Sequence, residues 1–359
     1  MREKFASSDA FSITEWLLTP FFYATSKILL LILGMPFYPK RTINRKMHDS
    51  MMQLVSSSAS FPEYNSGVMS KDIRVPSSDT GVTNLARLFL PRSAAGPIMV
   101  FIHGGGWSTL GFSVRFYHDL CKYFCEKMQI TVLSINYRLA PEYPFPTPLK
   151  DCQAALNWLA SPESFADVPE CIDRNSIIVA GDSAGGNLTA ALALMYVKEK
   201  PRNYKIILQI PIYPCFFKRP LTHSRTNPSF QYLMPLPQQM MDQFEMYYKP
   251  PNVTDNDFSK YDYVNSEDSS YLSSSRFPET VGIVAGMDIL RDEGISYFEK
   301  LKSLGKRVEY RVYQNARHAF LALPDVASKD AKNAKLFIVE SIIRVVREHD
   351  FKIRLSSSL

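Results

Sequence analysis

The chain has 359 residues, of which 46% are hydrophobic, so it is long enough to bury a large core. Its formal net charge of +6 is small for this length, and no stripe of basic and aromatic residues favours nucleic acid as a partner. The five cysteines are odd in number, and they match neither a disulfide framework nor a zinc site, which predicts a reduced, cytoplasmic protein without a bound metal.

An apolar stretch at residues 16–38 is the first feature along the chain. It is long enough to cross a bilayer, which takes about 20 apolar residues, but Pro20 and Lys27 interrupt it. Three interpretations remain open: a helix packed on the protein, an anchor on a membrane surface, or a true span. If the stretch spans a membrane, the basic residues that follow it favour a cytosolic position for the rest of the chain. A membrane-associated protein of this kind is expected at the endoplasmic reticulum.

Beyond a serine-rich connection at 50–70, strand and helix patterns alternate. Such alternation predicts an α/β fold with a mostly parallel sheet and helices on both faces. We expect strands at 72–75, 85–90, 98–102, 130–136, 177–179, 206–213, 281–288 and 307–313, and helices at 116–128, 151–160, 187–195, 290–304 and 327–349. Residues 137–146 are expected to form a structural corner, in which Arg138 and Glu142 could pair.

Residues 215–275 break this alternation. They are rich in proline, aromatic residues and methionine, and they contain a helical pattern at 238–248. An insertion of this length between two strands often serves as an active-site lid. The predicted organisation is therefore an N-terminal apolar segment at 1–60, followed by one α/β domain at 61–350 with a lid at about 215–275.

The strongest functional signal is the G-x-S-x-G motif at 181–185, which follows a β-branched run and precedes a helical pattern. A strand, a tight turn and a helix in this order predict a nucleophile elbow, with Ser183 at its tip. The two glycines allow the sharp turn, and the backbone N–H of Ala184 would face a developing oxyanion at the start of the helix. Asp182 is expected to support the turn rather than to react.

A second loop, His103–Trp107, follows the apolar strand predicted at 98–102. It contains three consecutive glycines, Gly104, Gly105 and Gly106. Glycines let the backbone approach a substrate closely and turn N–H groups towards it. In a chain with an elbow, this loop is interpreted as the other half of an oxyanion hole.

A serine nucleophile needs a base and a group that orients the base. On a sheet of this kind these follow the serine in the order acid and then histidine, each at a strand end. Of the six histidines, His318 alone follows closely on the last predicted strand. The acid is Asp288 or Asp292, and Asp288 is favoured because it lies at the strand end, whereas the helix dipole explains Asp292.

Five motifs occur in order and together carry a family resemblance. They are HGGGW at 103–107, YRLAPE at 137–142, GDSAGG at 181–186, GMDILRDEG at 286–294 and HAF at 318–320. Over roughly 70–350 the chain resembles the hormone-sensitive-lipase branch of the α/β-hydrolases, which includes arylacetamide deacetylase-like enzymes and carboxylesterases.

The resemblance implies an α/β-hydrolase fold, with an eight-stranded sheet and a mainly helical cap formed by residues 1–60 and 215–275. It also implies a carboxylic ester hydrolase with Ser183 as nucleophile, His318 as base and Asp288 as orienting acid. Gly105, Gly106 and Ala184 would supply the oxyanion N–H groups, and Gly104 would shape the loop. No cofactor is required.

The substrate is predicted less sharply than the chemistry. Apolar lid residues favour a short- to medium-chain or aryl ester, although they could equally pack the lid onto the body; they are Phe216, Phe217, Phe230, Tyr232, Met240, Met241, Phe244 and Met246. A membrane-associated sterol or lipid ester deacetylase, an amidase or an acyltransferase would use the same three residues. A non-catalytic binding protein, similar to the plant gibberellin receptors, is disfavoured because those receptors lack the histidine.

Overall fold

The computed structural model describes residues 67–93, 95–216, 221–231, 235–254, 269–323, 325, 328–349 and 351. The N-terminal segment predicted at 1–60, with its apolar stretch, lies outside these residues. Within the described ranges, no helix combines the length and the hydropathy that crossing a bilayer requires.

One mixed sheet forms the centre of the described structure, and it confirms the predicted α/β-hydrolase fold. The strands lie in the order β1-β2-β4-β3-β5-β6-β7-β8. The pairs β1–β2 and β2–β4 are antiparallel, and all other neighbours are parallel. In chain order the strands are β1 (Met69–Pro76), β2 (Thr83–Leu90), β3 (Gly96–Ile102), β4 (Thr131–Ile135), β5 (Ile172–Asp182), β6 (Lys205–Ile212), β7 (Glu279–Met287) and β8 (Val308–Arg317).

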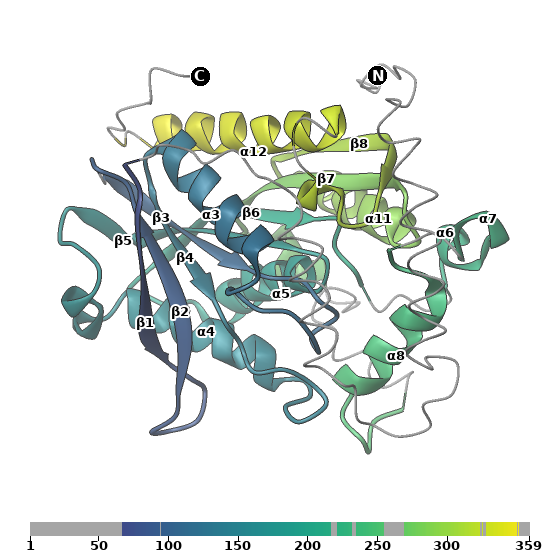
Figure 1. Cartoon of the computed structure of the whole chain (residues 1–359), viewed down its shortest axis with the longest axis horizontal. Helices are drawn as coiled ribbons and strands as arrows, with labels where there is room; N and C mark the ends of the chain where they lie inside the picture. Colours follow the sequence, from purple (N-terminus) through teal and green to yellow (C-terminus); the bar gives the residue numbers. More distant parts are fainter. Residues whose placement is uncertain are drawn as a thin grey trace.

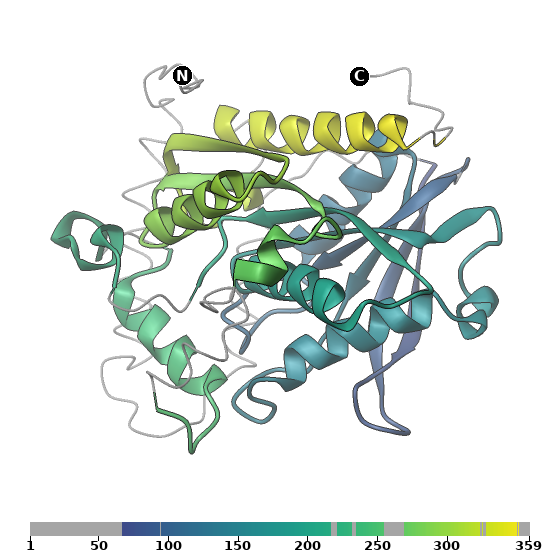
Figure 2. The same cartoon turned by 180° about the vertical axis from the view of Figure 1, so that it is seen from behind.

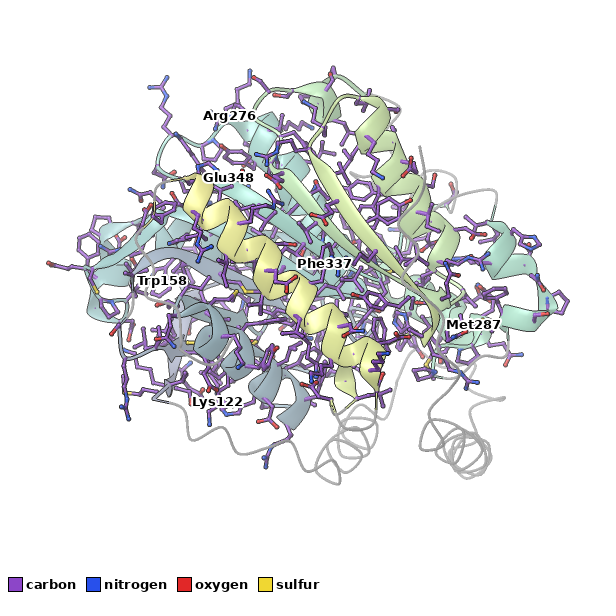
Figure 3. All side chains as sticks on the ribbon, turned by 90° about the horizontal axis from the view of Figure 1, so that it is seen from above. Lys122, Trp158, Arg276, Met287, Phe337 and Glu348 are labelled. Atoms are coloured by element: carbon purple, nitrogen blue, oxygen red, sulfur yellow. The ribbon has the colours of Figure 1, made fainter. Side chains whose placement is uncertain are left out.

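Helices cover both faces of this sheet (Figures 1 and 2). Two of them pack on one face and three on the other, and each set encloses its own hydrophobic cluster. On the first face lie α3 (Arg115–Met128) and α12 (Lys329–Glu348), and on the second lie α4 (Thr147–Leu159), α5 (Ala184–Glu199) and α11 (Arg291–Ser303). Seen from above, α12 runs across the strands and buries Phe337 against them (Figure 3).

The central strands are buried on both faces, which is why their sequences are continuously apolar rather than alternating. In β3, all five residues from Ile98 to Ile102 are completely buried. The largest difference from the predicted strands is β5, which extends from Ile172 to Asp182 on both sides of the predicted run. Strand β8 also continues further, to Arg317, because this residue still pairs with Met287 beyond a shift in register. Helix α4 also begins earlier than predicted, at Thr147, since Pro148 is compatible with a first helical turn.

Between β6 and β7 the chain leaves the sheet, over the region where the lid is predicted. Its described parts contain α6 (His223–Thr226), α7 (Pro228–Gln231), α8 (Gln238–Tyr248) and α10 (Ser269–Ser273). Helices α6, α7 and α8 lie beside the body, at the right of Figure 1. We call the described residues of this insertion the cap.

A buried ion cluster fastens the cap to the body. Arg225 of α6 is 1% exposed, and its Nε lies 2.9 Å from Oε2 of Glu293 in α11. Its Nη1 lies 2.6 Å from Oε1 of Glu245 in α8, so one guanidinium joins three helices. Glu293 also accepts a hydrogen bond of 2.7 Å from the backbone N–H of Phe216. Nothing in the local sequence pattern predicts this cluster.

The corner predicted at 137–146 is held by ion pairs other than the expected one between Arg138 and Glu142. Arg138 places its Nε 2.8 Å from Oδ2 of Asp151 and its Nη2 2.8 Å from Oδ1, a bidentate pair with a fully buried carboxylate. Its Nη1 contacts Asp79, in the turn between β1 and β2. The partners of Arg138 are therefore Asp151 and Asp79 rather than Glu142, because the start of α4 packs against the hairpin.

Candidate active site

The sheet register brings the predicted site residues to one edge. Ile102 pairs with Gly181, so the glycine loop after β3 begins beside the elbow after β5. Met287, labelled in Figure 3, pairs with Arg317, so the residues that follow β7 and β8 are also neighbours. Since all these strands are parallel, their carboxyl ends meet where ligands bind in open α/β sheets.

Ser183 stands at the tip of a strained turn. Its φ of 55° and ψ of −118° are unusual for a residue with a side chain, and such a strained conformation is what the predicted nucleophile elbow requires. The flanking glycines are required by space: a Cβ on Gly181 would lie 2.5 Å from the carbonyl oxygen of Gly185. A Cβ on Gly185 would lie 2.0 Å from that of Ile102. The chain can turn this sharply only because both side chains are missing.

Ser183, His318 and Asp288 form a continuous hydrogen-bonded chain. His318 Nε2 lies 2.9 Å from Ser183 Oγ, and His318 Nδ1 lies 2.7 Å from Asp288 Oδ2. A carboxylate can only accept, so Nδ1 carries the proton and Nε2 is left to accept the proton of the serine hydroxyl. Their side chains are largely buried, with residue exposures of 9% for Ser183, 9% for His318 and 2% for Asp288.

Asp292, the alternative to Asp288 as the acid, has other partners. Asp292 Oδ2 accepts a hydrogen bond of 2.8 Å from the N–H of Ser224 in the cap. Its Oδ1 lies 2.7 Å from Nε of Arg291. Asp292 therefore joins α11 to α6, and it does not contact His318.

The other histidines within the described residues lie elsewhere. His103 opens the glycine loop and stacks on Tyr137, with ring centroids 4.3 Å apart. His118 of α3 lies 3.1 Å from Nη1 of Arg87. His223 is in α6 and His349 follows α12, whereas His48 falls outside the described residues.

The backbone N–H groups of the glycine loop differ in whether they donate to acceptors within the protein. The N–H of Gly104 donates to Asp182 Oδ1 and to the hydroxyl oxygen of Tyr117, each over 2.9 Å, so it is directed into the protein. Gly105 and Gly106 have φ values of 104° and 58°, a region that favours glycine. In the described part of the chain, the N–H groups of Gly105, Gly106 and Ala184 donate to no protein acceptor.

The cap packs directly on this loop. The ring of Phe244 in α8 lies where a Cβ of Gly106 would be, 2.2 Å from that position. Trp107 stacks on Tyr248 at the end of the same helix, with ring centroids 4.3 Å apart and planes 7° apart. One helix of the cap therefore forms an aromatic wall beside the loop. Phe217 and Tyr232, two of the apolar lid residues, lie outside the described residues.

Asp182 is a buried carboxylate that sequence reasoning linked only to the elbow. Burial raises the pKa of Asp182 to about 6, although Gly104, Tyr117 and His318 all favour its charged form. The folded protein thus holds the proton more tightly than the unfolded chain does. The free energy of unfolding therefore falls as the pH rises from about 4 to about 6, and it stays at the lower value above pH 6.

Replacing Asp182 with asparagine is expected to stabilise the protein at pH 8. A shift of about two pKa units corresponds to roughly 3 kcal/mol, which sets the upper limit of the gain. At pH 4 the native carboxyl is already protonated, so the gain should nearly vanish. Urea unfolding of both proteins at pH 4 and pH 8 measures the difference, and an equal gain at both pH values would contradict this explanation.

Metal ligands do not gather in the part of the chain that the structure describes. No three His, Cys, Asp or Glu side chains there lie together in a way that could hold an ion. That the protein works without a metal or another cofactor stays a prediction, which the chemistry of a serine nucleophile supports.

Comparison with known proteins gives three informative similarities. The chain is 35% identical over 245 residues to the carboxylic ester hydrolase LipN of Mycobacterium tuberculosis, covering 66% of this chain and 61% of that protein. It is 26% identical over 307 residues to the gibberellin receptor GID1A of Arabidopsis thaliana, covering 80% and 84%. The structure of an esterase from the archaeon Pyrobaculum calidifontis is similar with a TM-score of 0.71 and 28% identity, covering 88% and 97%. The match to LipN thus spans less than two thirds of that relative's length.

A family model described as alpha/beta hydrolase fold matches residues 99–322. This range is more than half of the chain, and it includes the glycine loop, the elbow, the cap and the strand ends that carry Asp288 and His318. The match therefore includes all five motifs and the strands from within β3 to the end of β8, whereas β1 and β2 lie outside it. The chain belongs to the α/β-hydrolase family, in its hormone-sensitive-lipase-like branch.

Proposed function

We propose that this protein is a carboxylic ester hydrolase in which Ser183 is the nucleophile. The observation that carries the proposal is the hydrogen-bonded chain from Ser183 through His318 to Asp288 at the carboxyl edge of the sheet. A buried histidine that faces a strained serine on one side and a carboxylate on the other is poised to take a proton from the serine. The similarity to LipN, named a carboxylic ester hydrolase, and to the esterase of Pyrobaculum calidifontis supports the same activity.

In the first half of the reaction, Ser183 Oγ attacks the ester carbonyl carbon while His318 Nε2 takes the hydroxyl proton. The carbonyl oxygen becomes negatively charged, and the N–H groups of Gly105, Gly106 and Ala184 donate to it. Asp288 holds the imidazole in the required tautomer and stabilises its charged form. When the carbon–oxygen bond to the alcohol breaks, the alcohol leaves with the proton from His318, and the acyl group stays on Ser183.

The second half repeats these roles with water. His318 removes a proton from a water molecule, and the resulting hydroxide attacks the acyl carbon. The oxyanion forms at the same N–H groups. The bond to Ser183 then breaks, Oγ recovers its proton from His318, and the carboxylic acid is released.

A short- to medium-chain or aryl ester is the substrate that the surroundings favour. The aromatic wall formed by Phe244 and Tyr248 of α8, backed by Trp107, lies beside the proposed oxyanion donors, and apolar surroundings favour apolar acyl or aryl groups. An amide or an acyl acceptor other than water would use the same residues. A membrane-bound lipid or sterol ester would suit residues 16–38, whose association with a membrane stays a prediction that fractionation of the full-length protein can test.

A binding protein without catalysis is the second candidate, because one relative is named a receptor. The two candidates differ in what they require of His318. Binding alone needs no base next to Ser183, whereas hydrolysis does. The hydrogen bond of 2.9 Å between these two side chains favours the hydrolase.

Hydrolysis of p-nitrophenyl esters from acetate to palmitate, with p-nitroacetanilide as the amide, tests the proposal. We expect activity on the shorter esters, an initial burst of p-nitrophenol from acylation, and labelling of Ser183 by a fluorophosphonate. Activity restricted to the longest chains would make the protein a lipase, and faster cleavage of the anilide would make it an amidase. A folded protein that hydrolyses none of these compounds and resists the fluorophosphonate would contradict the proposal.

A further inference from the structure

Asp182 is a buried carboxylate next to the site, and the proposed mechanism assigns it no role. It is 3% exposed, and its two oxygens have separate partners. Oδ1 accepts the hydrogen bond of 2.9 Å from the N–H of Gly104, and Oδ2 accepts one of 3.3 Å from the hydroxyl of Tyr117 in α3. The Tyr117 oxygen also lies 2.9 Å from the N–H of Gly104. A carboxylate and a phenol thus hold one backbone N–H between them.

Asp182 and Gly104 belong to the two loops that carry the proposed oxyanion donors. Asp182 directly precedes Ser183 and lies two residues before Ala184, whereas Gly104 directly precedes Gly105. The contact between Asp182 and Gly104 therefore ties together two loops that are 78 residues apart in sequence. Between them, the two loops supply the proposed oxyanion donors. Space around Gly104 is equally tight, since a Cβ there would lie 2.9 Å from Asp182 Oδ2.

The stacked rings of His103 and Trp107 hold the two ends of the glycine loop, and Thr109 holds the carbonyl of Gly105, but Gly104, Gly105 and Gly106 have no side chains of their own. The contact with Asp182 adds a fixed point at the backbone N–H of Gly104. Gly105 and Gly106 adopt positive φ values, and each glycine has more freedom in the unfolded chain than any other residue. Oxyanion stabilisation depends on donors that are already in place when the charge develops. Burying a carboxylate costs free energy unless it accepts hydrogen bonds. Here the N–H of Gly104 and the hydroxyl of Tyr117 donate to Asp182.

We propose that Asp182 is a positioning residue, whose carboxylate, supported by Tyr117, fixes the N–H groups of Gly105 and Gly106 relative to Ser183. This inference rests on the proposed function, because it assigns those N–H groups to the oxyanion. Asp182 itself neither touches substrate nor exchanges a proton with it. Other ionisable groups around this carboxylate are His318 after β8, Tyr213 after β6, Tyr137 after β4 and Cys121 of α3. The ring of Tyr213 packs edge-on against His318, with centroids 5.1 Å apart.

Three variants separate this role from a general loss of stability. Asp182→Ala removes the acceptor, and kcat for p-nitrophenyl butyrate should fall about 10²-fold, the typical cost of losing one oxyanion donor, with KM changed less than about threefold. Asp182→Asn keeps a neutral acceptor oxygen and should recover most of that loss. Tyr117→Phe keeps the ring but removes the hydroxyl, so kcat should fall by a smaller factor. Tyr313→Phe, which removes a buried hydroxyl of β8 outside this network, is the matched control with unchanged kcat.

The inhibition constant of a transition-state analogue distinguishes a positioning role of Asp182 from a purely structural one. A trifluoromethyl ketone forms an adduct with the serine whose oxyanion needs the same donors. Its inhibition constant should therefore rise in Asp182→Ala by the same factor by which kcat/KM falls. Unchanged inhibition beside a reduced kcat, or unchanged values of both, would overturn the inference while Ser183→Ala still tests the hydrolase itself.

Hydrogen exchange tests the tie without relying on activity. Deuterium uptake by the peptide that contains residues 103–107 should be faster in Asp182→Ala than in the wild type, and unchanged in Tyr313→Phe. If Ser183→Ala retained full ester hydrolysis, the proposed function would fail. The positioning of the loop would then be decided by this exchange rate alone, and equal uptake in both proteins would reject it.

Discussion

Ester hydrolysis is expected to fall by about 10⁴-fold or more when Ser183 is replaced with alanine. The replacement removes the one oxygen that His318 Nε2 can activate, at 2.9 Å, and no other hydroxyl group of the described residues lies within hydrogen-bonding distance of that nitrogen. Hydrolysis must then proceed by direct attack of water on the ester, without a covalent intermediate. Steady-state kinetics with p-nitrophenyl butyrate measure the loss, and the burst of p-nitrophenol should disappear.

The two acids near β7 provide an internal control for this result. Asp288→Asn should lower kcat strongly, because an amide can donate to Nδ1 and favour the wrong tautomer of His318. Asp292→Asn should leave kcat within a few-fold of the wild type, since Asp292 contacts the cap rather than the histidine. Equal losses in both variants would place the orienting acid in doubt, and an active Ser183→Ala would remove the basis of the mechanism.

The second large effect concerns stability rather than chemistry. Replacing Arg225 with alanine is expected to lower the free energy of unfolding by about 3–5 kcal/mol, the cost of removing one partner from a buried ion pair. Without the guanidinium, Glu293 and Glu245 remain as buried carboxylates without their cation. Burial already raises the pKa of Glu293 to about 7 with the arginine in place. Guanidinium chloride unfolding followed by tryptophan fluorescence measures the change.

An exposed ion pair provides the contrast for this prediction. Lys302 lies 2.9 Å from Glu299, but the side chains are 42% and 52% exposed, so solvent screens their attraction. Lys302→Ala should therefore change the free energy of unfolding by less than about 1 kcal/mol. If Arg225→Ala were as mild as Lys302→Ala, the cap would have to be held mainly by its apolar contacts, such as those of Phe244 and Tyr248.

Some features could be read from the sequence because their causes are local. The eight predicted strands correspond to the eight strands of the structure, since an apolar run bounded by turns has few alternatives to a buried strand. The elbow follows from two glycines around a serine between a strand and a helix. Because parallel strands end at one edge, Ser183, Asp288 and His318 could be expected to be neighbours without a structure.

Other features could not be predicted from the sequence, because each depends on contact between two segments that are distant in the chain. Arg138 meets Asp151 and Asp79 instead of Glu142 only because α4 packs beside the first hairpin. The extension of β8 to Arg317 depends on its pairing with β7, since the residues after Tyr313 have no strand pattern of their own.

By itself, the sequence determined the type of fold, the order of its elements and the residues at the strand ends, because periodicity and tight turns act over a few residues. Only the tertiary structure decided which buried charges meet. Arg225 and Glu293 are 68 residues apart, and Asp182 and Gly104 are 78 residues apart. Each of these polar groups must find a partner once it is removed from water, and the packing of the whole chain decides which partner is within reach.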